Sequence, residues 1–177
     1  RRNILHGWRR DDRGVAVYLL RPFDYNNTMS LDLTVIGAGH VGLVTGACFA
    51  DLGHTVTMVD HDARRIANLK GGILPFYEPG LAELVSRGIR ERRLTFATSV
   101  KQGVDRSTII FIAVGTPSRA GGDADLTAVE DVAREIAKHL TGYRLIVEKS
   151  TVPVQTGEWI GKTIRAAMRR KLAFDVA

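Results

Sequence analysis

The stretch Val35-Ile36-Gly37-Ala38-Gly39-His40-Val41-Gly42 decides the fold. It places a G-x-G-x-x-G pattern directly after a short apolar run and at the start of a stretch with helical spacing. The three glycines allow a tight turn, close approach of backbone to a pyrophosphate and close packing of helix on strand, while the helix N-terminus faces the anion. The sequence therefore predicts a dinucleotide-binding turn made of Gly37, Ala38, Gly39, His40, Val41 and Gly42, with His40 as a polar loop residue rather than a catalyst.

A carboxylate at the end of the next strand agrees with this interpretation. Asp60 follows Gly37 by 23 residues, a distance at which an acid can accept hydrogen bonds from the adenosine ribose hydroxyls. Its charge would repel the 2′-phosphate of NADP, so we expect NAD as the cofactor. Arg64 and Arg65 follow closely and could accommodate that phosphate, which leaves NADP as the alternative.

Short β-branched runs alternate with amphipathic stretches through the main body of the chain. This alternation predicts an α/β fold of the Rossmann type, a doubly wound parallel sheet with helices on both faces. In the first helix, Val41, Val44, Cys48 and Leu52 recur at spacings of three and four and are expected to form its core stripe. Strands are expected near 32–36, 55–59, 94–97, 108–113 and 144–148, and further helices over about 62–70, 79–87 and 99–104.

The last third of the chain predicts two more helices. Asp125 can cap the first, whose apolar face consists of Leu126, Val129, Ala133, Ile136 and Leu140. The second follows Pro153 and carries Ile160, Ile164, Ala167 and Met168 on one side. We expect residues 29–152 to form the cofactor domain, and 153–177 to start a long connecting helix to a central or C-terminal domain that this chain lacks.

The N-terminal stretch differs from the rest in charge and pattern. Residues 1–28 contribute +3 of the formal net charge of +6 and show no sustained period of 2 or 3.6. We expect an extension with little stable structure, preceding a domain that starts at Met29. A basic arm that binds RNA or acidic lipid is the alternative, with Trp8, Tyr18, Phe23 and Tyr25 as its stacking partners.

Bulk properties exclude several classes of protein. The single cysteine, Cys48, excludes an internal disulfide and a multi-cysteine metal site, so no metal is expected. No apolar run approaches the roughly 18 to 20 residues of a membrane helix, and the basic start is not followed by a signal-peptide core. We expect a soluble cytoplasmic protein whose main domain binds neither membrane nor nucleic acid.

Three further segments are more specific than a general dinucleotide-binding pattern. They are Pro75-Phe76-Tyr77-Glu78-Pro79-Gly80-Leu81, Val114-Gly115-Thr116-Pro117-Ser118 and Glu148-Lys149-Ser150-Thr151-Val152-Pro153-Val154. Together with the glycine turn, and in this order, they resemble the UDP-glucose and GDP-mannose dehydrogenase family over about residues 29–168. The Tyr-Glu-Pro-Gly-Leu form is most similar to the UDP-glucose enzymes.

The resemblance implies roles for residues outside the glycine turn. Val114 to Pro117 follow the fourth strand, at the sheet edge where open α/β folds bind ligands, so Gly115, Thr116 and Pro117 are expected near the nicotinamide. Glu148 ends the fifth strand on the same edge and is implied in cofactor or substrate contact and in proton transfer. Thr116 and Glu148 are thus the catalytic candidates, while a strand-to-helix turn and an ion pair with Lys149 are their structural alternatives.

Two more positions match cofactor residues of the family. Arg65 corresponds to a basic residue beside the ribose acid, with a solvated helix residue as the alternative. Thr98 corresponds to a residue on the adenosine or pyrophosphate side, with an ordinary helix cap as the alternative.

The family oxidises the C6 alcohol of a nucleotide sugar twice, with two NAD and a cysteine that forms a thiohemiacetal and then a thioester. That cysteine does not map to this chain, since Cys48 is expected to be a core thiol. UDP-glucose is the substrate that the resemblance favours, with GDP-mannose and UDP-N-acetylmannosamine as alternatives. A homodimer is implied for the full-length protein only, and polysaccharide precursor supply as its purpose. A non-catalytic NAD-binding module is the alternative from another class.

Overall fold

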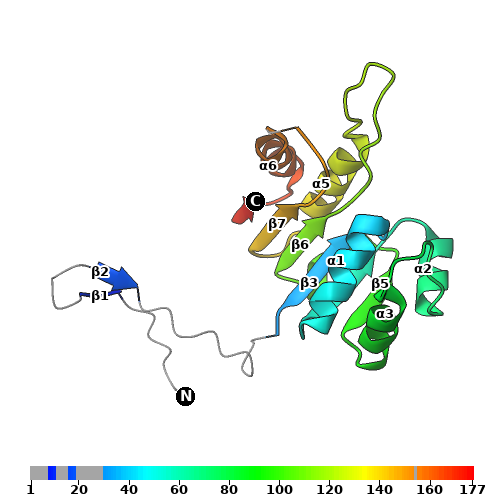
Figure 1. The fold of residues 1–177 in the computed structure, drawn as a ribbon. Helices are drawn as coiled ribbons and strands as arrows, with labels where there is room; N and C mark the ends of the chain where they lie inside the picture. Colours follow the sequence, from blue (N-terminus) through cyan, green and yellow to red (C-terminus); the bar gives the residue numbers. More distant parts are fainter. Residues whose placement is uncertain (1–7, 11–15, 19–29, 154) are drawn as a thin grey trace.

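The computed structural model describes residues 8–10, 16–18, 30–153 and 155–177 of the chain (Figure 1). The elements of its main body are β3 (Asp32–Ile36), α1 (His40–Asp51), β4 (Thr55–Val59), α2 (Ala63–Lys70), α3 (Leu81–Arg90), β5 (Leu94–Ala97), α4 (Val100–Arg106), β6 (Ile109–Ile112), α5 (Thr127–His139), β7 (Arg144–Glu148), α6 (Thr156–Ala167) and β8 (Phe174–Val176). The five predicted strands are β3 to β7, and each predicted helix is present.

Six strands form one parallel sheet in the order β5-β4-β3-β6-β7-β8. The main body starts in the middle of this sheet at β3, continues outward to β5, and then returns to β6 on the other side of β3. Connections that leave β3 and β6 in opposite directions open a crevice at the carboxyl ends of these two strands. The predicted doubly wound parallel sheet is confirmed.

Helices cover both faces of the sheet (Figure 1). One buried cluster joins the sheet to α1, α2 and α3, and a second joins it to α4, α5 and α6. Strand β3 feeds both clusters because alternate side chains of a strand point to opposite faces. Leu33 and Val35 pack toward α1, whereas Ile36 belongs to the second cluster and the hydroxyl of Thr34 donates to the carbonyl of Gly103 in α4, at 3.0 Å.

The predicted core stripe of α1 is wrong for three of its four residues, since only Val44 packs against the core, where it is partly buried. Val41 is 50% exposed, Leu52 is 63% exposed, and the thiol of Cys48 is exposed as well. The side that faces the sheet consists instead of mostly small residues: Gly42, Leu43, Gly46, Ala47 and Ala50. Small residues let the helix axis come close to the strands, because a Cβ at Gly46 would lie only 2.3 Å from the Met58 sulfur. Apolar spacing alone therefore selected the wrong face.

The C-terminal segment also differs from expectation. The predicted long helix after Pro153 ends at Ala167, and the chain turns back to add β8 beside β7. Ile160 and Ile164 are buried as predicted. A three-residue strand that follows a run of basic residues carries no periodic pattern, so β8 could not be predicted from the sequence. Residues 174–176 thus add a sixth strand to the sheet.

Part of the N-terminal stretch is paired. Trp8–Arg10 (β1) and Ala16–Tyr18 (β2) form an antiparallel two-stranded sheet, which the missing periodicity did not predict. Most of residues 1–28, and the expected domain start at Met29, lie outside the described residues.

The close contact between α1 and the turn before it leads to a stability prediction. A Cβ at position 42 would lie 1.8 Å from the carbonyl oxygen of Gly37, a backbone atom with no freedom to move aside. We expect Gly42→Ala to lower the free energy of unfolding by about 3 kcal/mol, the upper end of the cost of overpacking, as measured by chemical denaturation. Gly39→Ser is the matched control, since a Cβ there meets nothing within 4 Å. Equal stability of both variants would contradict this packing.

Candidate functional site

The glycine turn has the backbone geometry that the motif requires. Gly37 has a φ of +108°, a region that favours glycine, and a Cβ there would lie 2.4 Å from the carbonyl oxygen of Ala113 on the neighbouring strand connection. Gly39 is the N-cap of α1, and the space beside its Cα is open. Gly37 and Gly42 thus let the backbone fold tightly on itself, while Gly39 keeps room for a ligand at the helix N-terminus.

Asp60 joins the glycine turn to the start of α2. Its side chain is only 4% exposed. One carboxylate oxygen, Oδ2, accepts hydrogen bonds from the backbone N–H of Ala38 and from Nη1 of Arg65, both at 2.8 Å. The other, Oδ1, accepts from the backbone N–H of Asp62 at 2.9 Å. Nδ1 of the exposed His61 also lies 3.5 Å from Oδ1, a longer contact than the two on Oδ2. Because a carboxylate oxygen has two acceptor positions, Oδ1 is the oxygen of Asp60 that is better placed to accept from a further hydroxyl.

These contacts keep Asp60 ionised. Burial alone would raise the pKa of Asp60, but the hydrogen bonds from Asp62, Ala38 and Arg65 outweigh it, and the pKa lies below its usual value. The folded pKa is thus lower than the unfolded one, so the carboxylate stabilises the fold above the unfolded pKa and loses that effect as the pH falls through the folded pKa.

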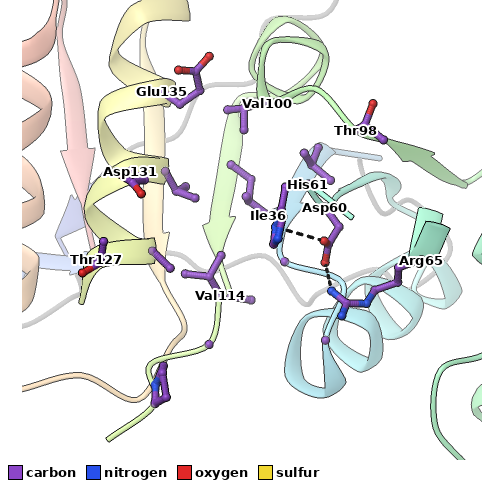
Figure 2. A pocket seen from close by; sticks show the side chains of 18 of the residues that line it. Ile36, Asp60, His61, Arg65, Thr98, Val100, Val114, Thr127, Asp131 and Glu135 are labelled. Carbon is purple, nitrogen blue, oxygen red and sulfur yellow. Dashed lines mark hydrogen bonds and ion pairs between the residues drawn. The ribbon is translucent and has the colours of Figure 1, made fainter. Parts of the chain in front are cut away.

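A cavity of about 880 Å³ opens at the carboxyl ends of β3, β4 and β6. In Figure 2, Asp60, His61 and Arg65 line one side of it, and Thr127, Asp131 and Glu135 of α5 line the opposite side. Ile36 of β3 also lines the cavity and lies between these two sides. The cavity has the size and the mixture of apolar walls and few polar groups that small-molecule sites have.

Glu148 ends β7 at the same sheet edge. Its Oε1 accepts a hydrogen bond from the backbone N–H of Ser150 at 2.6 Å, whereas Oε2 is buried with no hydrogen-bond partner among the described residues. Burial raises the pKa of Glu148 in spite of the bond from Ser150. A buried oxygen without a hydrogen-bond partner lowers the stability of the folded protein. Residues that act on a ligand often have a pKa shifted by burial in this way.

Hydrogen bonds join the loops that follow β6 and β7. The hydroxyl of Ser150 donates to the carbonyl of Val114 at 2.8 Å, and the hydroxyl of Thr116 donates to the carbonyl of Thr151 at 2.9 Å. The Glu-Lys-Ser-Thr and Val-Gly-Thr-Pro segments, which are far apart in the sequence, are therefore held side by side.

The structure brings about half of the predicted site residues into the cavity wall. Gly37, Gly39, Asp60, Arg65, Thr98, Gly115 and Pro117 line it. Ala38, Val41, Gly42, Thr116 and Glu148 do not, although Ala38 and Gly42 belong to the turn itself. The imidazole of His40 points to another loop, where it stacks on Phe76 at 4.4 Å between ring centroids and lies 3.1 Å from the Glu78 carboxylate.

The wall formed by α5 was missed. Thr127, Ala128, Asp131, Val132 and Glu135 all line the cavity. Thr127, Asp131 and Glu135 recur every four residues, which places three polar side chains along one side of the helix beside its apolar face. That spacing could have identified a second, ligand-facing side of α5, because the sheet order brings this helix to the crevice.

No helix in the described part of the chain is both long and apolar enough to cross a bilayer. In the same part of the chain, His, Cys, Asp and Glu nowhere gather in threes in a way that could hold a metal ion.

The sheet order, the glycine turn and the buried acid after β4 together define a dinucleotide-binding domain of the Rossmann type. Residues 31–177 match the NAD-binding domain of the UDP-glucose/GDP-mannose dehydrogenase family. The chain belongs to this family, and NAD is the cofactor of its domain.

Curated relatives are similar over most of the chain. A UDP-glucose 6-dehydrogenase of Bacillus subtilis is 47% identical over 144 residues, which cover 81% of this chain and 31% of the relative. A UDP-glucose 6-dehydrogenase of Rhizobium meliloti is 52% identical over 136 residues, covering 76% of this chain and 31% of the relative. The chain thus spans about a third of the length of the curated relatives that it matches.

Solved structures agree with this assignment. A UDP-glucose dehydrogenase of the archaeon Pyrobaculum islandicum superposes with a TM-score of 0.79 at 35% identity, over 89% of this chain and 37% of that one. A GDP-mannose dehydrogenase of Pseudomonas aeruginosa gives 0.77 at 32% identity, over 82% and 35%.

The raised pKa of Glu148 leads to a prediction about stability and pH. Because the folded pKa exceeds the unfolded one, the ionised side chain destabilises the fold above the folded pKa, and this effect disappears below the unfolded pKa. We expect Glu148→Gln to raise the melting temperature at pH 7 and to have little effect under acidic conditions, as measured by scanning calorimetry. Glu130→Gln, which removes an exposed ion pair with Arg134, is the control and should not stabilise. If the Glu148→Gln variant were less stable than the wild type at pH 7, the buried carboxylate of Glu148 would not destabilise the fold, and the prediction would be wrong.

Proposed function

We propose that this chain supplies the NAD-binding domain of a UDP-glucose 6-dehydrogenase, which oxidises UDP-glucose to UDP-glucuronate in two hydride transfers. The observation that carries the proposal is the buried Oε2 of Glu148, which has no hydrogen-bond partner among the described residues and lies at the same sheet edge as the glycine turn. The identity of 47% and 52% to UDP-glucose 6-dehydrogenases supports the choice of sugar.

Successive groups of residues around the cavity would bind successive parts of NAD. The backbone of Gly37 to Gly42 would hold the pyrophosphate at the N-terminus of α1. Asp60, through Oδ1, would accept a hydrogen bond from a ribose hydroxyl, and Arg65 would stay fixed beside it. Thr98 would lie on the adenosine side, and Gly115, Thr116 and Pro117 on the nicotinamide side.

Bound NAD would accept a hydride from the sugar in each of the two oxidations. Glu148, whose raised pKa favours uptake of a proton, would use Oε2 to position a water molecule or to move a proton. Thr116 would keep the loop after β6 in place beside the reacting end through the hydrogen bond that its hydroxyl donates to the carbonyl of Thr151. Cys48 does not line the cavity, so the family's nucleophilic cysteine is proposed to lie outside this chain.

The proposal has rivals both for the sugar substrate and for the role of the chain. GDP-mannose and UDP-N-acetylmannosamine are the rival sugars, because the residues that would read the sugar lie largely outside the 31% of the relatives that the chain spans. A non-catalytic NAD-binding module is the rival role. A reading frame that continues past Ala177 into a cysteine-bearing domain would exclude it. We further propose, for the full-length protein, a cytoplasmic homodimer that supplies precursors for polysaccharide synthesis.

The contacts of Asp60 predict the cofactor preference of the chain. We expect calorimetric titration to show binding of NAD and much weaker binding of NADP. Asp60→Asn should weaken the affinity for NAD by about 10- to 100-fold, which is the effect of losing a hydrogen bond to a charged group.

Asp105→Asn is the matched control for this titration. Asp105 is an exposed acid of α4 that does not line the cavity, so its variant should bind NAD like the wild type. Equal affinity of wild type and Asp60→Asn for NAD would exclude Asp60 as a ribose ligand.

The proposed reaction predicts a fixed stoichiometry for the full-length protein. With UDP-glucose as the limiting substrate, we expect two NADH for each sugar consumed, measured by absorbance together with product analysis. GDP-mannose and UDP-N-acetylmannosamine should give little NADH under the same conditions. A single NADH per sugar, or a preference for another sugar, would contradict the proposal.

A further inference from the structure

We infer that Asp131 of α5 accepts a hydrogen bond from the 6-amino group of the adenine of NAD and so selects adenine at this end of the cavity. The inference deepens the proposed function, because it rests on NAD lying in the cavity with its ribose at Asp60.

The glycine turn and Asp60 give the cofactor a direction. The pyrophosphate belongs at the N-terminus of α1, and the ribose belongs at Asp60, whose carboxylate is tied to the turn through Ala38. The base is attached to that ribose on the side away from the pyrophosphate. It therefore extends from the Asp60 side across the cavity, toward the wall formed by α5 (Figure 2).

Apolar side chains offer the flat faces of a base a place to pack. Val100 at the start of α4 and Val132 on α5 both line the cavity, and both are only half-exposed. These contacts would bind any planar base and do not distinguish one from another. Discrimination requires a polar group at the edge of the base.

Two carboxylates of α5 lie on this wall, Asp131 and Glu135. Each carboxylate oxygen of Glu135 already has one partner within α5, since Oε2 accepts from Nζ of Lys138 at 2.8 Å and Oε1 lies 2.9 Å from Nε2 of His139. Asp131 is exposed and has no hydrogen bond or ion pair to any described residue. Asp131 is therefore the carboxylate of this wall with all of its acceptor positions open to a donor from a ligand.

The chemistry of the base determines what such a carboxylate selects. An ionised aspartate is an acceptor only, and the 6-amino group of adenine is a donor. Hypoxanthine carries an oxygen at position 6, which would face the carboxylate as a second acceptor and repel it. A site with Asp131 at this edge should thus prefer NAD to nicotinamide hypoxanthine dinucleotide, which differs from NAD only in the base.

The test compares the affinities of the whole 177-residue chain for these two dinucleotides by calorimetry. We expect the wild type to bind NAD at least tenfold more tightly than the hypoxanthine analogue. Asp131→Asn should reduce this ratio to about one or invert it, since the asparagine amide can donate to the oxygen at position 6. Glu135→Gln, on the same wall, is the matched control and should keep the wild-type ratio.

The ratio of the two affinities distinguishes recognition of the base from a structural effect. A variant that only loosens α5 would weaken the binding of both dinucleotides equally. A ratio unchanged by Asp131→Asn, or one changed only by Glu135→Gln, overturns the inference while the proposed NAD site stands. Absence of NAD binding by the wild-type chain would overturn both.

Discussion

The carboxylate of Asp60 is the contact on which the ligand site depends. It is buried at the end of β4 and accepts hydrogen bonds from the glycine turn after β3, from the start of α2 and from Arg65. Three segments of chain thus converge on one charge, and that charge is kept ionised by the same contacts. Without it, the N–H of Ala38 would be a buried donor with no partner, and the turn would lose its fixed position relative to β4.

The same contact explains how a carboxylate can serve both structure and recognition. Oδ2 accepts from Ala38 and Arg65, whereas Oδ1 accepts from Asp62 and lies 3.5 Å from Nδ1 of His61, which leaves Oδ1 as the proposed ligand acceptor. Arg65 neutralises part of the charge but is itself fixed by it, which limits its use as a phosphate ligand. The expected preference for NAD over NADP therefore depends on both residues, because replacing either one removes the hydrogen bond that fixes the other.

Local sequence predicted most of the architecture, because strands β3 to β7 and the helices that connect them carry their own patterns. The G-x-G-x-x-G turn, the β-branched runs and the acid at position 60 needed no tertiary information. The face of α1 did need it, since packing distance rather than apolar spacing selects Gly46 and Ala47 for the sheet side. Strand β8 is three residues long and is defined by its neighbour β7, so no local signal could reveal it. The cavity wall on α5 likewise depends on the sheet order, which brings residues 127–135 opposite Asp60.

The unexpected orientation of α1 has a practical consequence for solution work. The chain contains one cysteine, and its thiol is exposed on the helix whose first residues form the NAD turn. A maleimide fluorophore can therefore be attached at Cys48 in a single place, without removing other thiols or introducing a new one. The emission of the fluorophore would report changes around α1 when a dinucleotide binds in the cavity. Cys48, which was predicted to lie in the core, thus offers a spectroscopic probe of the site.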